Sequence, residues 1–125
     1  LAHAALNFSA LAALQESIDF PDRDVMEPFL VTLRGATSKG DTYSRLLLAP
    51  PMPPEDPFTG SATGAMASYL WAHGLIETPD FVAEQGHGLG RPGFAKVHVM
   101  GPRDAIAGVR LAGAAHVTMS GHLNL

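Results

Sequence analysis

The 125-residue sequence contains no cysteine, which excludes disulfide bonds, thiolate nucleophiles and zinc sites built from thiolates. A chain without disulfides fits a reducing compartment, and we expect a cytoplasmic protein. Basic residues are also few, since eight Lys and Arg stand against twelve Asp and Glu, for a net charge of −4. The eight are scattered and form no basic stripe, so nucleic acid is not an expected partner.

Charge is missing altogether from residues 57–76, which contain no Asp, Glu, Lys or Arg. A membrane span is one interpretation of such a run. The segment is interrupted, however, by Pro57, Thr59, Gly60, Ser61, Thr63, Gly64, Ser68 and His73. Too few apolar residues remain for the ~20 that a span requires. We therefore expect no membrane partner.

The same segment favours a helix inside the protein. Its apolar residues fall on every side of a 3.6-residue wheel, namely Ala62, Ala65, Met66, Ala67, Tyr69, Leu70, Trp71, Ala72 and Leu75. This pattern predicts a central helix at about residues 61–75 that is buried all round. Gly74 is the residue expected just past the C-terminus of that helix.

The residues before this helix combine a carboxylate, a turn and a helix start. Pro57 lacks a backbone donor and Gly60 can adopt positive φ, so the chain can turn sharply after Asp56. The first N–H groups of the helix and its dipole would then favour a substrate carboxylate or phosphate near Thr59, Gly60 and Ser61. The alternative is that Asp56, Thr59 and Ser61 only cap the helix and form the turn.

Strand patterns surround the predicted helix. Apolar or β-branched runs occupy residues 29–34, 43–49, 81–85, 94–100, 106–111 and 115–119, divided by turns rich in Gly or Pro. A short amphipathic helix over residues 6–18 precedes them, started by Asn7 or Ser9. We expect one domain over residues 1–125, of the α+β class, with a curved, mixed or largely antiparallel sheet around the central helix.

A second polar cluster lies at residues 84–93. Gly88, Gly90 and Gly93 have the spacing of a dinucleotide-binding fingerprint, but Pro92 leads into a strand and not into a helix, so we reject that interpretation. The glycines instead favour a turn where two backbones approach closely. Glu84, Gln85 and Arg91 are expected to hold this turn.

The six histidines show no paired-ligand spacing, so neither a metal nor another cofactor is expected. Solvated or core histidines are the simplest interpretation. His87 is the one histidine that the neighbouring glycines could place at the edge of a cleft.

These motifs together resemble the PhzF-like isomerase family of phenazine biosynthesis. The residues that carry the resemblance are RLLLAP (45–50), EDPFTGSA (55–62), EQG (84–86), GRP (90–92), VRLAG (109–113) and VTMSGHL (117–123). Their order and spacing also agree with the second half of that family, from about Phe29 onward. The sequence departs from the family pattern at Leu89, often Met, and at Gly93, often Ser.

The resemblance implies a diaminopimelate-epimerase-like fold, in which two similar domains each wrap a sheet around a central helix and enclose the active site. This chain would be the C-terminal domain, with a complementary N-terminal domain or chain as its partner and a dimer as its assembly. The implied activity is a proton shift on a small carboxylic acid without metal or cofactor. Asp56 would bind the substrate and assist proton transfer, while Gly60 and Ser61 would hold the polar groups of the substrate.

In the related epimerases and racemases, a catalytic cysteine stands at the place of Ser61, so a two-thiol mechanism is not implied. The family's glutamate base belongs to the first domain, which has no counterpart in these 125 residues. We therefore expect the chain alone to be inactive. The alternative is a binding or structural module that has kept the fold without the catalysis.

Overall fold

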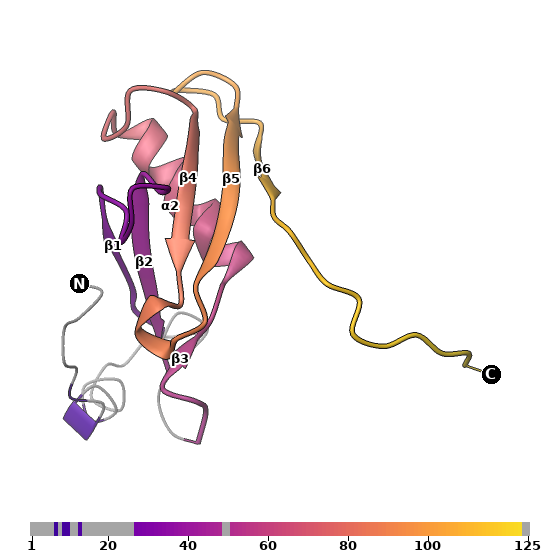
Figure 1. The fold of residues 1–125 in the computed structure, drawn as a ribbon. Coiled ribbons are helices and arrows are strands. Elements are labelled where there is room, and N and C mark those ends of the chain that lie inside the picture. Colours follow the sequence, from indigo (N-terminus) through magenta and orange to yellow (C-terminus); the bar gives the residue numbers. More distant parts are fainter. Residues whose placement is uncertain (1–6, 8, 11–12, 14–26, 49–50, 124–125) are drawn as a thin grey trace.

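The computed structural model describes residues 7, 9–10, 13, 27–48 and 51–123. One helix lies on one face of a six-stranded sheet (Figure 1). The elements in chain order are β1 (Phe29–Thr32), β2 (Thr42–Leu47), β3 (Glu55–Asp56), α2 (Gly60–Ala72), β4 (Asp80–Gln85), the 3-10 turn η1 (His87–Leu89), β5 (Gly93–Met100) and β6 (Gly108–Ala112).

The sheet is mixed, and its strands follow the order β1-β2-β4-β5-β6, with β3 paired to β2. Neighbouring strands are antiparallel except β2 and β4, which run parallel. A parallel pair needs a crossover connection, and here α2 lies within that crossover. The predicted α+β class with a mixed sheet is therefore confirmed.

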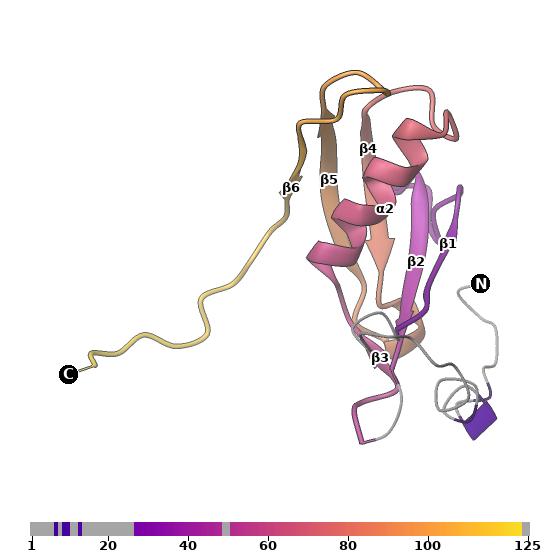
Figure 2. The ribbon, with the colours of Figure 1, turned by 180° about the vertical axis from the view of Figure 1, so that it is seen from behind.

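Helix α2 packs on the sheet through one face, as Figure 2 shows from behind. Its buried apolar residues and those of β4 and β5 form one cluster: Met66, Ala67, Leu70, Phe81, Ala83, Val97 and Val99. Burying a Met, Leu, Val or Phe side chain contributes about 1.5–3 kcal/mol. This cluster fixes the position of α2, and therefore of its N-terminus, against β4 and β5.

The prediction that α2 is buried on every side is wrong for the residues that the structure describes. Ala65 and Ala72 are exposed, and Tyr69 keeps 59% of its surface accessible. These side chains are largely apolar, but they stay exposed because no described element covers this side of the helix. The predicted end is confirmed, because Gly74 has a φ of +66° and Leu75 N–H donates to the Leu70 carbonyl at 2.9 Å.

The strand predictions hold for residues 29–34, 43–49, 81–85, 94–100 and 106–111, with ends shifted by a few residues. The strand predicted at residues 115–119 is wrong. After β6 the chain leaves the sheet (Figure 1) and forms no regular element up to residue 123. Val117 and Met119 are 90% and 87% exposed, because no strand in the described part of the chain pairs with them.

The helix expected over residues 6–18 falls mostly outside the described residues. Ser9, Ala10 and Ala13, which are described, are helical. Asn7 Oδ1 accepts a hydrogen bond from Ala10 N–H at 2.9 Å, as an N-cap side chain does. No helix in the described part of the chain has the length and hydropathy needed to cross a bilayer.

Candidate active site

The predicted site lies at one end of the sheet. The parallel strands β2 and β4 both finish there, and β3 places Asp56 opposite Leu46 near the end of β2. Helix α2 begins four residues after Asp56. In α/β arrangements, ligands bind beyond the carboxyl ends of parallel strands, where helix N-termini also point. The structure therefore brings Asp56, Thr59, Gly60 and Ser61 together in such a position.

Asp56 and Thr59 are joined directly. The Thr59 hydroxyl donates a hydrogen bond to Asp56 Oδ2 at 2.5 Å. Thr59 occupies the N-cap position of α2 but makes no side-chain capping bond. Its hydroxyl is directed to the carboxylate instead of to the helix, so the capping interpretation fails for Thr59. An ionised carboxylate accepts such a bond, and the bond fixes the orientation of Asp56.

The side chain of Gln85, at the end of β4, holds the turn that links these two residues. Gln85 Nε2 donates to the Asp56 carbonyl oxygen at 2.8 Å and to Thr59 Oγ1 at 3.1 Å. Gln85 Oε1 accepts from Thr59 N–H at 3.1 Å. The carboxamide is 1% exposed, so these bonds replace water completely. Sequence reasoning assigned Gln85 to the glycine turn and missed its contacts with the Asp56 turn.

The helix start is open at two of the three predicted positions. Thr59 N–H is taken by Gln85, whereas Gly60 and Ser61 are exposed and their N–H groups have no partner among the described residues. The first helical backbone bond from this region joins Thr63 N–H to the Thr59 carbonyl at 3.0 Å. Ala62 N–H also has no partner among the described residues, so three unpaired donors remain at the positive end of the helix dipole.

The expected role of Gly60 in the turn is wrong. Gly60 does not have positive φ, and a Cβ added to it would meet only Leu111 Cδ1 at 3.8 Å. The turn is closed by the Thr59 hydroxyl and the Gln85 carboxamide, so no left-handed residue is needed. Positive φ occurs instead at Gly86 and Gly90, at +82° and +66°.

Gly86 lets the glycine turn approach the Asp56 turn. A Cβ at Gly86 would lie 2.3 Å from the Arg91 carbonyl oxygen and 2.5 Å from the Pro57 carbonyl oxygen. Arg91 N–H also donates to the Gly86 carbonyl at 3.0 Å. The predicted close approach of two backbones is confirmed, and one of the two backbones is the turn that follows Asp56.

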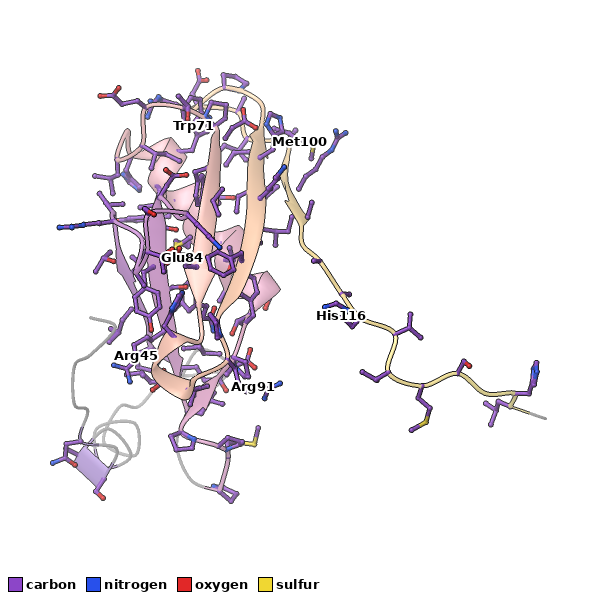
Figure 3. All side chains as sticks on the ribbon, in the orientation of Figure 1. Arg45, Trp71, Glu84, Arg91, Met100 and His116 are labelled. Atoms are coloured by element: carbon purple, nitrogen blue, oxygen red, sulfur yellow. The ribbon has the colours of Figure 1, made fainter. Side chains whose placement is uncertain are left out.

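Glu84, which is labelled in Figure 3, lies with His87 on the other face of the sheet. Successive strand residues point to opposite faces, so Glu84 points away from the side where Gln85 meets Asp56. The Glu84 carboxylate is fully buried and accepts from Thr37 N–H at 2.9 Å and from the Thr37 hydroxyl. His87 Nε2 lies 3.4 Å from Glu84 Oε2. Glu84 therefore holds the 35–41 loop, and His87 lies beside it.

A hollow of about 500 Å³ adjoins Asp56. Its lining includes Leu46, Pro54, Pro57, Leu89 and Arg91 as well as Glu55 and Asp56. Thr59, Gly60 and Ser61 do not line it, so the hollow meets the candidate site only at Asp56. The Glu55 carboxylate is already neutralised, since it forms a buried two-bond ion pair with Arg45, and this hydrogen bonding raises the pKa of Arg45. The Glu55 carboxylate is thus bound by the Arg45 guanidinium, while the Asp56 carboxylate accepts a hydrogen bond from the neutral Thr59 hydroxyl.

The described residues include no cluster of three or more His, Cys, Asp or Glu side chains that could hold a metal ion. The groups at the start of α2 are a carboxylate, a hydroxyl and unpaired backbone donors. Such a set can bind an anionic group and can exchange a proton beside it.

Comparisons with known proteins place the chain in a family. A protein of Bacillus subtilis (strain 168) with the name "Uncharacterized isomerase YfhB" is 38% identical over 45 residues. That match covers 36% of this chain and 15% of the relative, so the aligned part is a small piece of that protein. The sequence model of the family described as "Phenazine biosynthesis-like protein" matches residues 5–121. The chain therefore belongs to the phenazine biosynthesis-like protein family.

Proposed function

We propose that this chain forms one wall of the active site of a cofactor-independent isomerase that shifts a proton on a small carboxylic acid. The observation that carries the proposal is the fixed Asp56 carboxylate beside an open helix N-terminus. Membership of the phenazine biosynthesis-like family and the similarity to a protein named as an isomerase support the reaction class.

The residues divide the work by their chemistry. The free N–H groups of Gly60 and Ser61 bind the substrate carboxylate, assisted by the helix dipole and the Ser61 hydroxyl. Asp56 lies beside the bound acid and assists the transfer of its proton. Thr59 and Gln85 do not touch substrate in this proposal, but they hold Asp56 in the orientation that the transfer needs.

The general base that removes the C–H proton comes from outside these residues. In the proposal it is a glutamate of a complementary N-terminal domain, on the same protein or on another chain. The uncovered side of α2, where Tyr69 is 59% exposed and Ala65 and Ala72 are also exposed, is the surface on which such a partner would pack. We further propose a cytoplasmic dimer as the working assembly.

The proposal is tested by adding the partner in trans. The purified chain is assayed on candidate unsaturated or hydroxylated carboxylic acids in D₂O, alone and with a family N-terminal domain. We expect deuterium at the isomerised carbon only in the mixture. Isomerisation by the chain alone would contradict the divided site, and an inactive but tightly formed complex would contradict the proposed reaction.

Binding without turnover is the second candidate function. It is favoured by the helix donors at Gly60 and Ser61, which bind a carboxylate whether or not a base is present. A crystal grown with a small carboxylate should hold the anion at these two residues in either case. The D₂O assay separates the two functions, because a binding module exchanges no substrate hydrogen.

A further inference from the structure

A second hollow, of about 460 Å³, lies on the face of the sheet opposite α2, which faces the viewer in Figure 1. The side chains that shape it come from three strands, from the 35–41 loop and from the start of the C-terminal segment: Lys39, Val82, Phe94, Lys96, Ala112 and Ala114. Asp56 and the start of α2 are not part of its lining. The two hollows are therefore separate sites.

The register of the sheet explains why the base of this hollow is apolar. Lys96 on β5 pairs with Val82 on β4 and with Ala112 on β6, so these three side chains form one row on one face. Phe94 lies two residues before Lys96 and therefore points to the same face. The small Ala112 side chain beside the large Phe94 ring leaves the floor hollow.

Positive charge is concentrated at this hollow. The sequence contains only two lysines, Lys39 and Lys96, and both line it. Lys39 Nζ lies over the Phe94 ring, 5.9 Å from its centroid, while Lys96 rises from the adjacent row. Neither lysine forms an ion pair among the described residues. One ammonium group thus lies over the Phe94 ring, and a second lysine lines the same hollow, in a chain whose net charge is −4.

The acids near these lysines each have another partner. Asp41 Oδ2, in the same loop as Lys39, accepts a hydrogen bond from Val82 N–H at 2.7 Å. Glu84 pairs with Phe94 across the strands, but its carboxylate is fully buried and bound by Thr37. Two residues further along β5 from Lys96, His98 pairs with Asp80 across the strands. His98 Nδ1 is hydrogen-bonded to Asp80 Oδ1 at 2.8 Å. No Asp or Glu lines the hollow. Its charge is therefore complementary to an anion.

We propose that this hollow binds a small aromatic carboxylate. The ring of the ligand packs on Val82, Phe94 and Ala112, and its carboxylate lies between the ammonium groups of Lys39 and Lys96. The volume suits such a ligand, since small-molecule sites measure roughly 300–1,000 Å³ and combine apolar walls with a few polar groups. The site is distinct from the one at Asp56, and it needs no partner domain.

The test is a titration of the isotope-labelled chain with phenylacetate, followed by amide chemical shifts in NMR spectra. We expect saturable shifts at residues 39, 82, 94–96 and 112–114, with millimolar affinity that weakens as salt is added. Phenylacetamide, which has the same ring without the charge, should bind more weakly. Shifts confined to other residues, or equal binding of the acid and the amide, would overturn the proposal.

Matched variants distinguish a specific effect of the two lysines from a general effect of positive charge on phenylacetate binding. Lys39→Gln and Lys96→Gln should each weaken phenylacetate binding by about twofold to fivefold, as exposed ion pairs do. Arg110→Gln removes a cation from the same face in the row beyond Lys96 and should leave the affinity unchanged. An equal loss in all three variants would mean nonspecific attraction and would overturn the site.

A segment of the protein is the competing occupant of the hollow. If residues 115–123 or a second copy filled it, the free chain would show contacts between Val117 or Met119 and Phe94, or a dimer in sedimentation. Phenylacetate would then have to displace that segment. Either observation would contradict a site that is open to a small acid.

Discussion

The hydroxyl of Thr59 donates to the carboxylate of Asp56 across one turn, at a distance of 2.5 Å. This bond uses the hydroxyl that a threonine at an N-cap ordinarily gives to the helix. The helix start consequently keeps its free donors, and the carboxylate beside them keeps one orientation. The side chain at the N-cap position therefore binds the carboxylate and not the backbone of the helix.

The first prediction concerns this bond. Thr59→Val removes the donor to Asp56 with little change in volume, and we expect turnover of the complete assembly to fall roughly tenfold, which is about 1.4 kcal/mol. Thr59→Ser keeps the hydroxyl and should restore most of the rate. Equal rates for the Val and Ser variants would show that the hydroxyl does not position Asp56.

The second prediction concerns the buried carboxamide of Gln85. Gln85→Met leaves the Asp56 carbonyl and Thr59 N–H without their side-chain partner, so the free energy of unfolding should fall by roughly 2–4 kcal/mol. Urea denaturation measures this value. Glu77→Met, at an exposed position, is the control and should change stability by less than about 0.5 kcal/mol. Similar values for the two variants would contradict the role of Gln85.

The third prediction separates backbone strain from steric contact at the glycine turn. Gly86 and Gly90 both have positive φ, but only at Gly86 would a Cβ meet neighbouring backbone, at 2.3 and 2.5 Å. Gly90→Ala should cost about 1–2 kcal/mol from conformation alone. Gly86→Ala should cost about 1–3 kcal/mol more, and it should broaden the amide signals of the Asp56 turn. Equal losses of stability would mean that the close approach is unimportant.

The fourth prediction follows from Tyr43, which is 1% exposed. Burial raises the pKa of its hydroxyl above the ordinary value of 10.0. The unfolded chain therefore loses this proton first, so the stabilising effect is complete below about pH 10 and is lost as pH rises through the folded pKa. Unfolding free energy should fall above pH 10 in the wild type, and Tyr43→Phe should flatten that decline. If the unfolding free energy of Tyr43→Phe fell above pH 10 as steeply as that of the wild type, Tyr43 would not be the source of the decline.

The sequence predicted the strands and the central helix because each has a local signal. Alternating or β-branched runs mark β1, β2, β4 and β5, and Gly74 marks the end of α2. The parallel pairing of β2 with β4 has no such signal, since residues 42–44 meet residues 83–85 only after the crossover through α2. The pairing of two strands that are separated by a crossover depends on the tertiary fold, so the local sequence does not predict it.

The proximity of the four candidate residues was predicted, but the contacts that hold them were not. Asp56, Thr59, Gly60 and Ser61 are adjacent in sequence, so a turn before a helix was enough to bring them together. Gln85 comes from another strand, and its contact with Asp56 depends on the β2–β4 pairing. Periodicity also predicted a strand at residues 115–119, yet a strand forms only where another strand offers hydrogen bonds.

The central claim is that Asp56 takes part in proton transfer, and the most direct measurement is the turnover number of Asp56→Asn in the complete assembly. The substitution keeps the size of the side chain and removes its proton exchange, so we expect a fall of about 10²–10⁴-fold with an unchanged circular dichroism spectrum. Asp104→Asn, at an exposed position in the turn after β5, should retain the wild-type rate. A turnover number for Asp56→Asn equal to that of Asp104→Asn, with the fold intact, would contradict the acid/base role and leave Asp56 as a residue of the turn.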